Sequence, residues 1–266
     1  MDLKTNILGT MKGAIIDINV DCGESFGRYK LGNDEEVLKF VSSANVATGF
    51  HAGDPSVLWN TIKIAKKYNI AVGAHPGLQD IRGFGRRRIL IDPDELKADI
   101  LYQLGAIEGF LKVEGLKLQH VKPHGALYVM VEHDETYANA FMEAIELYNP
   151  ELIVVVERET LFWKKARTKG LRVASEAFPD LAYDPQGKII IEKAKKPWDP
   201  NLVLNRALKI IKEGKIDTIE GKEIEIKADT LCIHGDSPNA VEVAKTLREG
   251  LEKEGIKIAK LSEIIK

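Results

Sequence analysis

The stretch Ile70-Ala71-Val72-Gly73-Ala74-His75-Pro76-Gly77 decides the fold, because a short apolar run ends in a histidine followed by turn residues. Apolar runs of this length between turn signals are typical of buried strands in a parallel sheet. The same pattern recurs around His51, His124 and His234. In parallel α/β folds, ligands bind at the carboxyl ends of the strands. We therefore expect the four histidines to share one site.

Seven apolar runs alternate with segments of helical period along the chain. The expected strands cover 14–20, 44–48, 70–73, 116–121, 152–156, 171–174 and 230–233, and the expected helices cover 34–43, 56–68, 92–113, 134–147, 159–169, 201–213 and 240–253. This alternation predicts an α/β fold with a parallel sheet, either open and doubly wound or closed. An open sheet gathers its ligands where the strand order reverses, whereas here nearly every strand is followed by a chemically able side chain. The pattern favours an irregular (β/α) barrel of seven strands, with 256–259 as a candidate eighth strand.

Several segment boundaries carry a recognisable signal. An aspartate stands directly before a proline at Asp54, Asp92 and Asp199, and Ser237-Pro238 has the same form. A capping oxygen followed by proline favours the start of a helix. The long connection 177–200 contains a Pro/Gly turn before an apolar run, which predicts a hairpin-containing loop near the barrel mouth.

Composition and charge argue against several classes of protein. The chain has 266 residues, is 44% hydrophobic, and carries 38 Lys and Arg against 40 Asp and Glu, a formal charge of -2. This balance offers no field to attract nucleic acid or an anionic membrane, and no apolar stretch approaches the roughly 20 residues that span a bilayer. Two cysteines and the lack of a signal peptide are typical of a soluble cytoplasmic protein. We expect a single barrel domain over 1–266, with 1–12 a dispensable extension.

Polar side chains at the strand ends make up the candidate site. The candidate catalytic residues are Asp21, Glu24, His51, Asp54, His75, Lys122, His124, His234 and Asp236. Lys122 lies within a largely apolar run, so its ammonium group needs a carboxylate or an anionic substrate as partner. Asp54 and Asp236 stand close before prolines, where a role as a helix cap is the alternative.

Other titratable residues are weaker candidates. Glu157, Glu176 and Asp180 also follow strands, and for the two glutamates a structural pairing is at least as good an interpretation. His120 and His133 lack the strand-end context, and we expect them to be ordinary structural residues.

The same side chains offer ligands for a metal ion. Three protein ligands drawn from His51, His75, His124, His234, Asp21 and Asp54 would suit a catalytic zinc or manganese site. These residues are scattered along the chain, and no Glu/His pair at helical spacing joins them. The sequence alone leaves the presence and identity of a metal undecided.

Six motifs in the same order resemble those of the LamB/YcsF family, over residues 13 to about 262. They are Asp17-Ile-Asn-Val-Asp-Cys-Gly-Glu24, Gly49-Phe-His-Ala-Gly-Asp-Pro55, Gly73-Ala-His-Pro-Gly77, Gly83-Phe-Gly-Arg-Arg87, Val121-Lys-Pro-His-Gly-Ala-Leu-Tyr128 and Leu231-Cys-Ile-His-Gly-Asp236. The resemblance implies a fold similar to the seven-stranded barrels of glycoside hydrolases and deacetylases. It also implies hydrolysis of 5-oxo-L-proline to L-glutamate, coupled to cleavage of ATP to ADP and phosphate, in a complex with two companion subunits. Thr48 departs from the family's usual cysteine, and Leu181 from an arginine that relatives often have.

The implied reaction makes sense of the residue types. Phosphorylation of the lactam oxygen by ATP would give a leaving group and a carbon that water can attack, which calls for cations, a general base and a proton donor. The candidates are Lys122, Arg86 and Arg87 as cations for the phosphoryl oxygens, Asp21, Glu24, His51 or Asp54 as the base, and His124 or His234 as the donor to the departing amine.

Nucleotide binding has no strong signal in the sequence. No Gly-x-x-x-x-Gly-Lys-Ser/Thr stretch occurs, and the glycine-arginine stretch 83–88 is equally well a solvated basic turn. We therefore expect ATP, with its Mg²⁺, to be bound in an unusual way or at a site shared with a companion subunit. Two other functions stay open: a metal-dependent carbohydrate deacetylase or amidohydrolase that needs no ATP, and a non-catalytic subunit that binds the lactam. Homo-oligomerisation also stays open.

Overall fold

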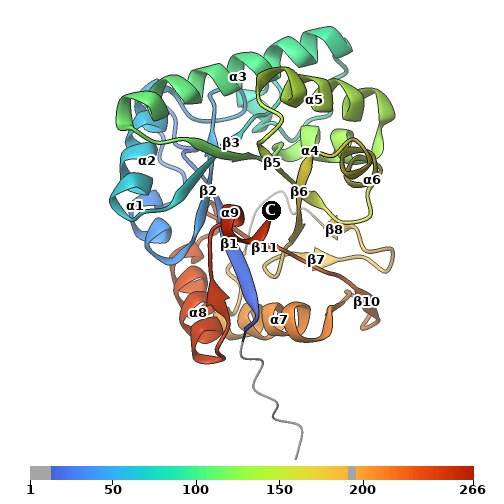
Figure 1. The fold of residues 1–266 in the computed structure, drawn as a ribbon. Helices are drawn as coiled ribbons and strands as arrows, with labels where there is room; N and C mark the ends of the chain where they lie inside the picture. Colours follow the sequence, from blue (N-terminus) through green and yellow to red (C-terminus); the bar gives the residue numbers. More distant parts are fainter. Residues whose placement is uncertain (1–12, 191–195) are drawn as a thin grey trace, which may run out of the picture.

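Seven parallel strands close into a ring at the centre of the structure (Figure 1). This computed structural model describes residues 13–190 and 196–266. In ring order the strands are β1 (Ile15–Cys22), β2 (Ser43–Ala47), β3 (Ala71–His75), β4 (Leu118–Val121), β5 (Ile153–Glu157), β6 (Arg172–Ala177) and β11 (Thr230–His234). Strand β11 pairs in parallel with both β6 and β1, and the second pairing closes the barrel. The predicted seven-stranded barrel is confirmed.

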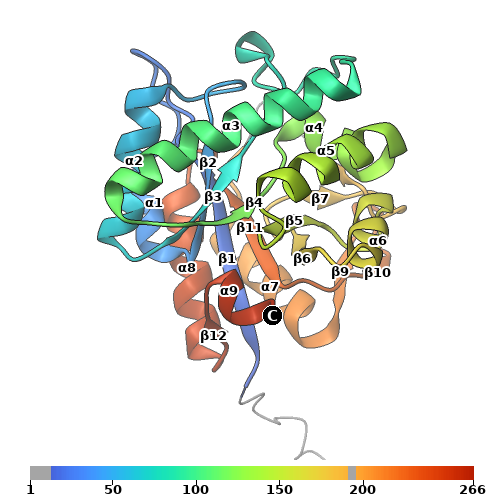
Figure 2. The ribbon, with the colours of Figure 1, turned by 45° about the horizontal axis from the view of Figure 1, so that its top comes forward.

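Helices surround the barrel and bury the outward side chains of its strands (Figure 2). They are α1 (Asp34–Val37), η1 (Leu38–Phe40), α2 (Pro55–Lys67), η2 (Ile81–Gly83), α3 (Pro93–Glu114), α4 (Gly125–His133), α5 (Glu135–Tyr148), α6 (Leu161–Thr168), α7 (Pro200–Glu213) and α8 (Ala240–Lys253). On β1, Ile18 and Val20 belong to this outer core. Since side chains alternate along a strand, Asp17, Asn19 and Asp21 point into the barrel. No helix within 13–190 or 196–266 has the length and apolar character that crossing a bilayer requires.

The C-terminal segment closes the end of the barrel where the strands begin. Strand β12 (Lys257–Ile258) pairs with the start of β1, outside the ring, so 256–259 adds no eighth strand to the barrel. Helix α9 (Leu261–Ile264) lies across the barrel in Figure 1. Its Leu261 packs against Ile153, Val155 and Ala174 in a small apolar cluster separate from the outer core.

Three of the four predicted capping signals are confirmed. The aspartates before α2, α3 and α7 accept hydrogen bonds from first-turn N–H groups, and each is followed by proline. Helix α8 begins at Ala240, as the predicted range 240–253 has it, but its N-cap is Asn239, so the capping role predicted for Ser237-Pro238 is wrong. The side chain of Asn239 bonds to both the N–H and the carbonyl of Trp198, which holds the chain in a turn before the helix.

Two further differences concern α4 and the hairpins. Helix α4 was not predicted, because Leu127, Tyr128, Met130 and Val131 are all buried and leave no polar stripe. The hairpin predicted after β6 consists of β7 (Ala182–Tyr183) and β8 (Ile189–Ile190), and a second hairpin joins β9 (Lys215–Asp217) to β10 (Glu223–Glu225). The predicted extension 1–12 lies outside the described residues, as do residues 191–195 of the 177–200 loop.

Candidate active site

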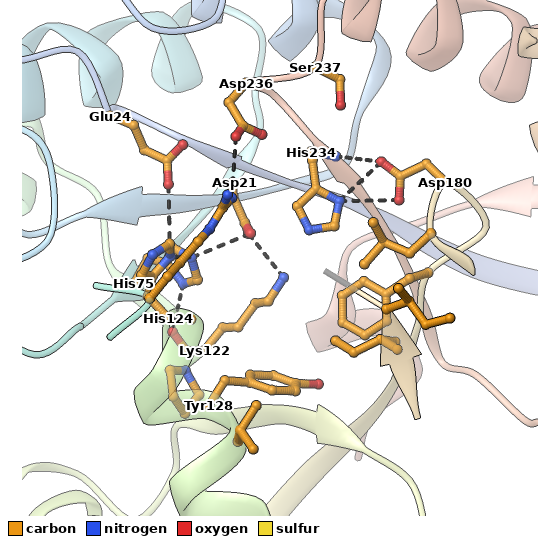
Figure 3. Close-up of a pocket in the computed structure, with 18 of the residues that line it drawn as sticks. Asp21, Glu24, His75, Lys122, His124, Tyr128, Asp180, His234, Asp236 and Ser237 are labelled. Carbon is orange, nitrogen blue, oxygen red and sulfur yellow. Dashed lines mark hydrogen bonds and ion pairs between the residues drawn. The ribbon is translucent and has the colours of Figure 1, made fainter. Parts of the chain in front are cut away.

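A cavity opens where the barrel strands end, and polar residues from several strands line it (Figure 3). Its polar wall contains Asp21, Glu24, His75, Lys122 and His124, its rim contains Arg86, Asp180, Lys196, His234 and Asp236, and its apolar wall contains Tyr128, Phe178, Leu181, Ile189, Ile190 and Trp198. Most of the predicted strand-end residues therefore meet around one space, but His51 and Asp54 do not line it. The hairpin of β7 and β8 contributes to the apolar wall.

Lys122 is the centre of a buried ion-pair network on the polar wall. Its Nζ lies 3.0 Å from Asp21 Oδ1 and 2.9 Å from Glu176 Oε1. Burial alone would lower the pKa of Lys122, but the negative groups around it, Asp21 first, raise that pKa well above its ordinary value. Burial alone would raise the pKa of Asp21, but its interactions with His75 and with the Lys122 ammonium group hold that pKa well below its ordinary value. Lys122 thus has two carboxylate partners, Asp21 and Glu176, where the sequence predicted one.

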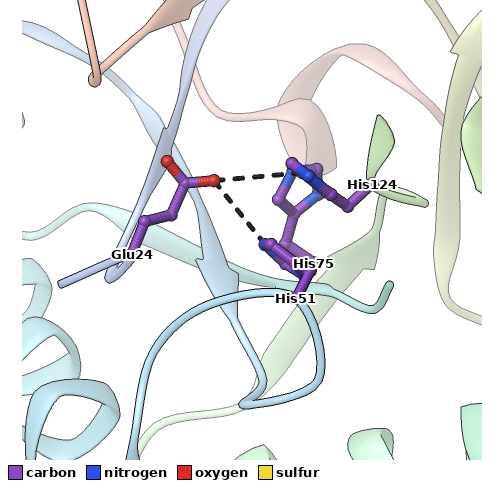
Figure 4. Close-up of side chains that lie close together, drawn as sticks. All are labelled: Glu24, His51, His75 and His124. Atoms are coloured by element: carbon purple, nitrogen blue, oxygen red, sulfur yellow. Dashed lines mark hydrogen bonds and ion pairs between the residues drawn. The ribbon is translucent and has the colours of Figure 1, made fainter. Parts of the chain in front are cut away.

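Three histidines pack ring against ring beside this network (Figure 4). His51 stacks on His124 with ring centroids 3.6 Å apart and ring planes at 6°, and His75 meets both rings edge-on. Burial lowers the pKa of His51 and of His124 well below the ordinary value, so both rings are neutral near pH 7. Glu24, from the turn after β1, places Oε1 3.6 Å from His51 Nε2 and 3.9 Å from His124 Nδ1.

Glycines bring the backbone directly against the histidine stack. Gly85 has a φ of 63°, and a Cβ there would lie 2.6 Å from His51 Cβ and 2.7 Å from His124 Cδ2. A Cβ on Gly77 would lie 2.6 Å from His51 Nδ1. Glycine alone fits such close approaches. The Gly-Phe-Gly stretch therefore packs against the rings, and the Phe84 carbonyl accepts a hydrogen bond from His124 Nε2 at 2.7 Å.

His234 stands at the rim and is oriented by Asp180. The pairing of β11 with β1 places His234 in register with Asp21. Asp180 accepts hydrogen bonds from the backbone N–H of His234 at 2.9 Å and from its ring Nδ1 at 3.1 Å. Ring Nε2 is therefore the atom that His234 can offer to a ligand. Arg206 of α7 donates to the carbonyls on either side of Asp180 and so fixes this loop.

The two candidate arginines lie in different surroundings. Arg86 lines the cavity, and one guanidinium nitrogen lies 3.3 Å from Asp236 Oδ2. Arg87 pairs with Asp80 and is not among the residues that line the cavity. Only Arg86 is placed to meet a ligand in this cavity.

Three other residues lie away from the cavity. Asp54 accepts hydrogen bonds from N–H groups at the start of α2 and from Gly27 N at 2.8 Å, which is the helix-cap alternative. His120 is buried inside the barrel, with Nε2 2.8 Å from Asn45 Oδ1, and His133 is exposed near the end of α4.

Two buried acids, Glu132 and Glu176, and the half-buried Glu157 lie behind Lys122. The Tyr128 hydroxyl donates to Glu176 Oε2 at 3.1 Å, and Glu132 accepts from the backbone N–H of Glu157 at 2.6 Å. Burial, followed by the charge of Glu176, raises the pKa of Glu157 to about 8, and burial beside Glu157 raises that of Glu132 well above its ordinary value. Neither Tyr128 nor Glu132 was a predicted site residue, because both lie on α4, a helix that the sequence pattern does not reveal.

The fold and the cavity together define a class of protein: a closed β/α barrel whose strand ends hold buried histidines, carboxylates and a lysine. Strongly shifted pKa values at this position in a barrel are typical of an enzyme active site. The chain belongs to the LamB/YcsF family, whose sequence profile matches residues 16–266. The membership predicted from the six motifs is thus confirmed.

Relatives of similar length share one name, the A subunit of 5-oxoprolinase. The relative of that name from Thermus thermophilus is 46% identical over 245 residues, which cover 91% of this chain and 98% of the relative. The one from Thermococcus onnurineus is 48% identical over 255 residues, or 94% and 99% of the two chains. The crystal structure of the lactam utilization protein from T. thermophilus has a TM-score of 0.85 at 45% identity, covering 92% of this chain and 99% of that one. A family 4 carbohydrate esterase from Streptomyces lividans has a TM-score of only 0.48 at 10% identity, covering 92% of each chain.

Proposed function

We propose that this chain is the A subunit of an ATP-dependent 5-oxoprolinase, which hydrolyses 5-oxo-L-proline to L-glutamate while ATP is cleaved to ADP and phosphate. The observation that carries the proposal is identity of 46% and 48% to proteins of that name, over more than nine-tenths of this chain. A lettered subunit belongs to a complex of several chains. The proposed partners are two companion chains, the B and C subunits.

The cavity suits a small lactam acid. The ring of 5-oxoproline has apolar methylene groups, a polar amide edge and one carboxylate. The side chains of Phe178 and Trp198 offer apolar surface to the ring, and Lys122 and Asp21 face the amide.

The chemistry needs ATP because a five-membered lactam has little strain and an unreactive carbonyl carbon. Transfer of the γ-phosphoryl group to the amide oxygen forms an O–P bond, releases ADP and leaves the ring carbon open to attack. Water adds to that carbon, the C–N bond breaks as nitrogen takes a proton, and an acyl phosphate remains. A second water hydrolyses it to glutamate and phosphate. Lys122 and Arg86 supply positive charge toward the phosphoryl oxygens.

His234 is the proposed group that moves the proton. Its Nε2 takes a proton from the attacking water, while Asp180 stabilises the resulting imidazolium through Nδ1. The same Nε2 then returns the proton to the ring nitrogen as the C–N bond breaks. One residue thus supplies both base and acid.

The ATP site is proposed to lie between this chain and a companion subunit. The Walker spacing is missing from the sequence, and Arg86 at the cavity rim is already paired with Asp236. Equilibrium binding of labelled ATP is expected to be much weaker with the isolated chain than with the complete complex. Equal affinity for both preparations contradicts a shared site.

The test of function is reconstitution of this chain with its companion subunits, followed by assays of glutamate and ADP from 5-oxoproline. His234→Gln is expected to lower kcat by about 10²–10⁴-fold, the usual contribution of general acid–base catalysis, with a smaller change in KM. His133→Gln, at an exposed histidine outside the cavity, is the matched control. Release of acetate from acetylated sugars without nucleotide, and no glutamate from 5-oxoproline, would overturn the proposal in favour of a deacetylase. A His234→Gln loss of substrate affinity equal to its loss of rate would instead indicate a lactam-binding subunit.

A further inference from the structure

Glu24, His75 and His124 all line the cavity, and their side chains lie close together (Figure 4). His75 Nε2 and His124 Nδ1 are 3.0 Å apart, and Glu24 Oε1 lies 3.9 Å from His124 Nδ1. One ligand atom from each of these residues, and one from His51, lie within 4.8 Å of one another. All four residues are buried. Unlike the candidate set drawn from the sequence, this group includes Glu24 and lacks His234.

The hydrogen bonds on the far sides of two rings determine which nitrogens carry protons. His75 Nδ1 lies 2.8 Å from the Lys122 carbonyl, and His124 Nε2 lies 2.7 Å from the Phe84 carbonyl. A carbonyl oxygen only accepts, so both of these nitrogens donate an N–H. A neutral imidazole has a single N–H, so His75 Nε2 and His124 Nδ1 turn lone pairs toward each other. Two lone pairs and the Glu24 carboxylate repel one another in this buried place unless a cation lies between them.

We propose that Glu24, His75 and His124 bind one divalent transition-metal ion, with zinc preferred, and leave one coordination position open to the cavity. Two imidazoles and a carboxylate are a ligand set that zinc accepts in catalytic sites. Ligand atoms at 2.0–2.1 Å around a tetrahedral ion lie about 3.3 Å apart, so the observed 3.0 Å and 3.9 Å need only small side-chain shifts. The backbone carbonyls behind His75 and His124 are typical second partners of metal-bound histidines.

His51 is a positioning residue in this arrangement. Its ring is parallel to that of His124, so an ion in the plane of the His124 ring lies outside the plane of the His51 ring. Both ring nitrogens of His51 are buried, and among the described residues neither has a hydrogen-bond partner. Its Nε2 lies 3.6 Å from Glu24 Oε1, where a small movement forms a hydrogen bond that orients the ligating carboxylate. His51 does not line the cavity, whereas the three proposed ligands do.

The proposed metal site lies in the cavity of the proposed function, and only the catalytic role of the ion, not its binding, rests on that function. A bound ion of this kind polarises a carbonyl oxygen or lowers the pKa of a bound water. The competing explanation is a proton on His75, because Asp21 Oδ2 lies 3.4 Å from His75 Nε2 and would accept from an imidazolium. The metal content of the purified chain separates the two explanations, because a protonated His75 would need no metal ion.

The experiment uses the full chain, stripped with a chelator and titrated with Co²⁺, whose visible absorption reports coordination, and then with Zn²⁺ in competition. The expected result is one ion per chain by elemental analysis, with Zn²⁺ displacing Co²⁺ and raising the melting temperature. Glu24→Gln and His124→Asn should abolish binding, His51→Asn should weaken it about 10–100-fold, and His133→Asn should bind like the wild type.

Two results would overturn the site. One is a stripped wild-type chain that takes up no stoichiometric ion, and the other is Glu24→Gln protein that binds as tightly as the wild type. Circular dichroism of each variant shows whether lost binding reflects lost folding, and the wild-type result decides the question alone if the variants do not fold. A chain that binds no ion yet forms glutamate with its companions overturns only this inference. A chain that binds one ion yet never hydrolyses 5-oxoproline overturns only the proposed function.

Discussion

Replacing Asp17 by asparagine is expected to change how stability depends on pH. Asp17 lies inside the barrel, where its carboxylate accepts hydrogen bonds from the hydroxyls of Ser42, Ser43 and Thr230. Burial, partly offset by these bonds, raises its pKa from 3.8 to about 6. The carboxyl group therefore loses its proton more readily in the unfolded chain. The free energy of unfolding should fall as pH rises from about 4 to about 6 and stay lowered above that range.

The size of the effect follows from the shift. One pKa unit corresponds to about 1.4 kcal/mol, so a shift of roughly two units costs about 3 kcal/mol of stability at neutral pH. Asp17→Asn cannot ionise and keeps the shape of the side chain. The free energy of unfolding of the variant minus that of the wild type is therefore expected to increase by about 3 kcal/mol between about pH 4 and pH 7.

Urea unfolding at several pH values, followed by tryptophan fluorescence and far-UV circular dichroism, measures this difference. The two probes must give coincident transitions for the free energies to be compared. Asp199→Asn is the matched control, because asparagine caps a helix as well as aspartate does and this position is outside the barrel interior. A difference between Asp17→Asn and wild type that stays constant with pH would refute the reasoning.

Three further predictions test other parts of the site and its support. Lys122→Met leaves two buried carboxylates without their cation and should lower the free energy of unfolding by about 3–5 kcal/mol. Adding Glu176→Gln removes one of those carboxylates and should restore part of the lost stability. A double variant that recovers no stability contradicts the network. Gly85→Ala should reduce both the melting temperature and glutamate formation, because the new Cβ would lie 2.6 Å from His51 Cβ. The control is Gly105→Ala on the open face of α3, which should add about 0.5–1 kcal/mol to the free energy of unfolding. Burial raises the pKa of Glu157 to about 8, so the stability of the wild type should fall as pH rises from about 4.5 to 8. The melting temperature of Glu157→Gln, measured by thermal unfolding, should therefore rise relative to that of the wild type over this pH range. Melting temperatures of the two proteins that change in parallel with pH would be evidence against the shift.

The strands and most helix starts could be predicted from sequence because local chemistry determines them. Strands buried on both sides are typically apolar throughout, and Ile153–Glu157 shows this in Ile-Val-Val-Val. Helix α4 could not be found in this way, since residues 125–133 are buried on several sides and their apolar residues show no helical period. The cap predicted at Ser237-Pro238 failed because a long-range contact between Asn239 and Trp198 outweighs the local Ser-Pro signal.

The candidate site was predictable in its members but not in their pairing. Strand-end position brings His75, His124 and His234 to one rim, because parallel strands end at the same edge. The partner of His234 is Asp180, 54 residues away in sequence, and no local pattern joins the two. The nitrogen that each ring presents to the cavity depends on carbonyls of remote residues, so only the structure reveals it.

The barrel interior explains why these side chains can be held so firmly. Where many barrels place branched apolar residues, β1 here contributes Asp17, Asn19 and Asp21. The Asn19 amide donates to Glu176 at 3.0 Å across the barrel, and the Asn45 amide donates to both Asn19 Oδ1 and Asp21 Oδ1. A continuous hydrogen-bonded column therefore leads from the closed end of the barrel to the carboxylates that hold Lys122. Buried polar networks stabilise a structure only when their members are satisfied together, so a change deep in the barrel, such as Asn45→Leu, is expected to displace Asp21 and impair glutamate formation at the mouth.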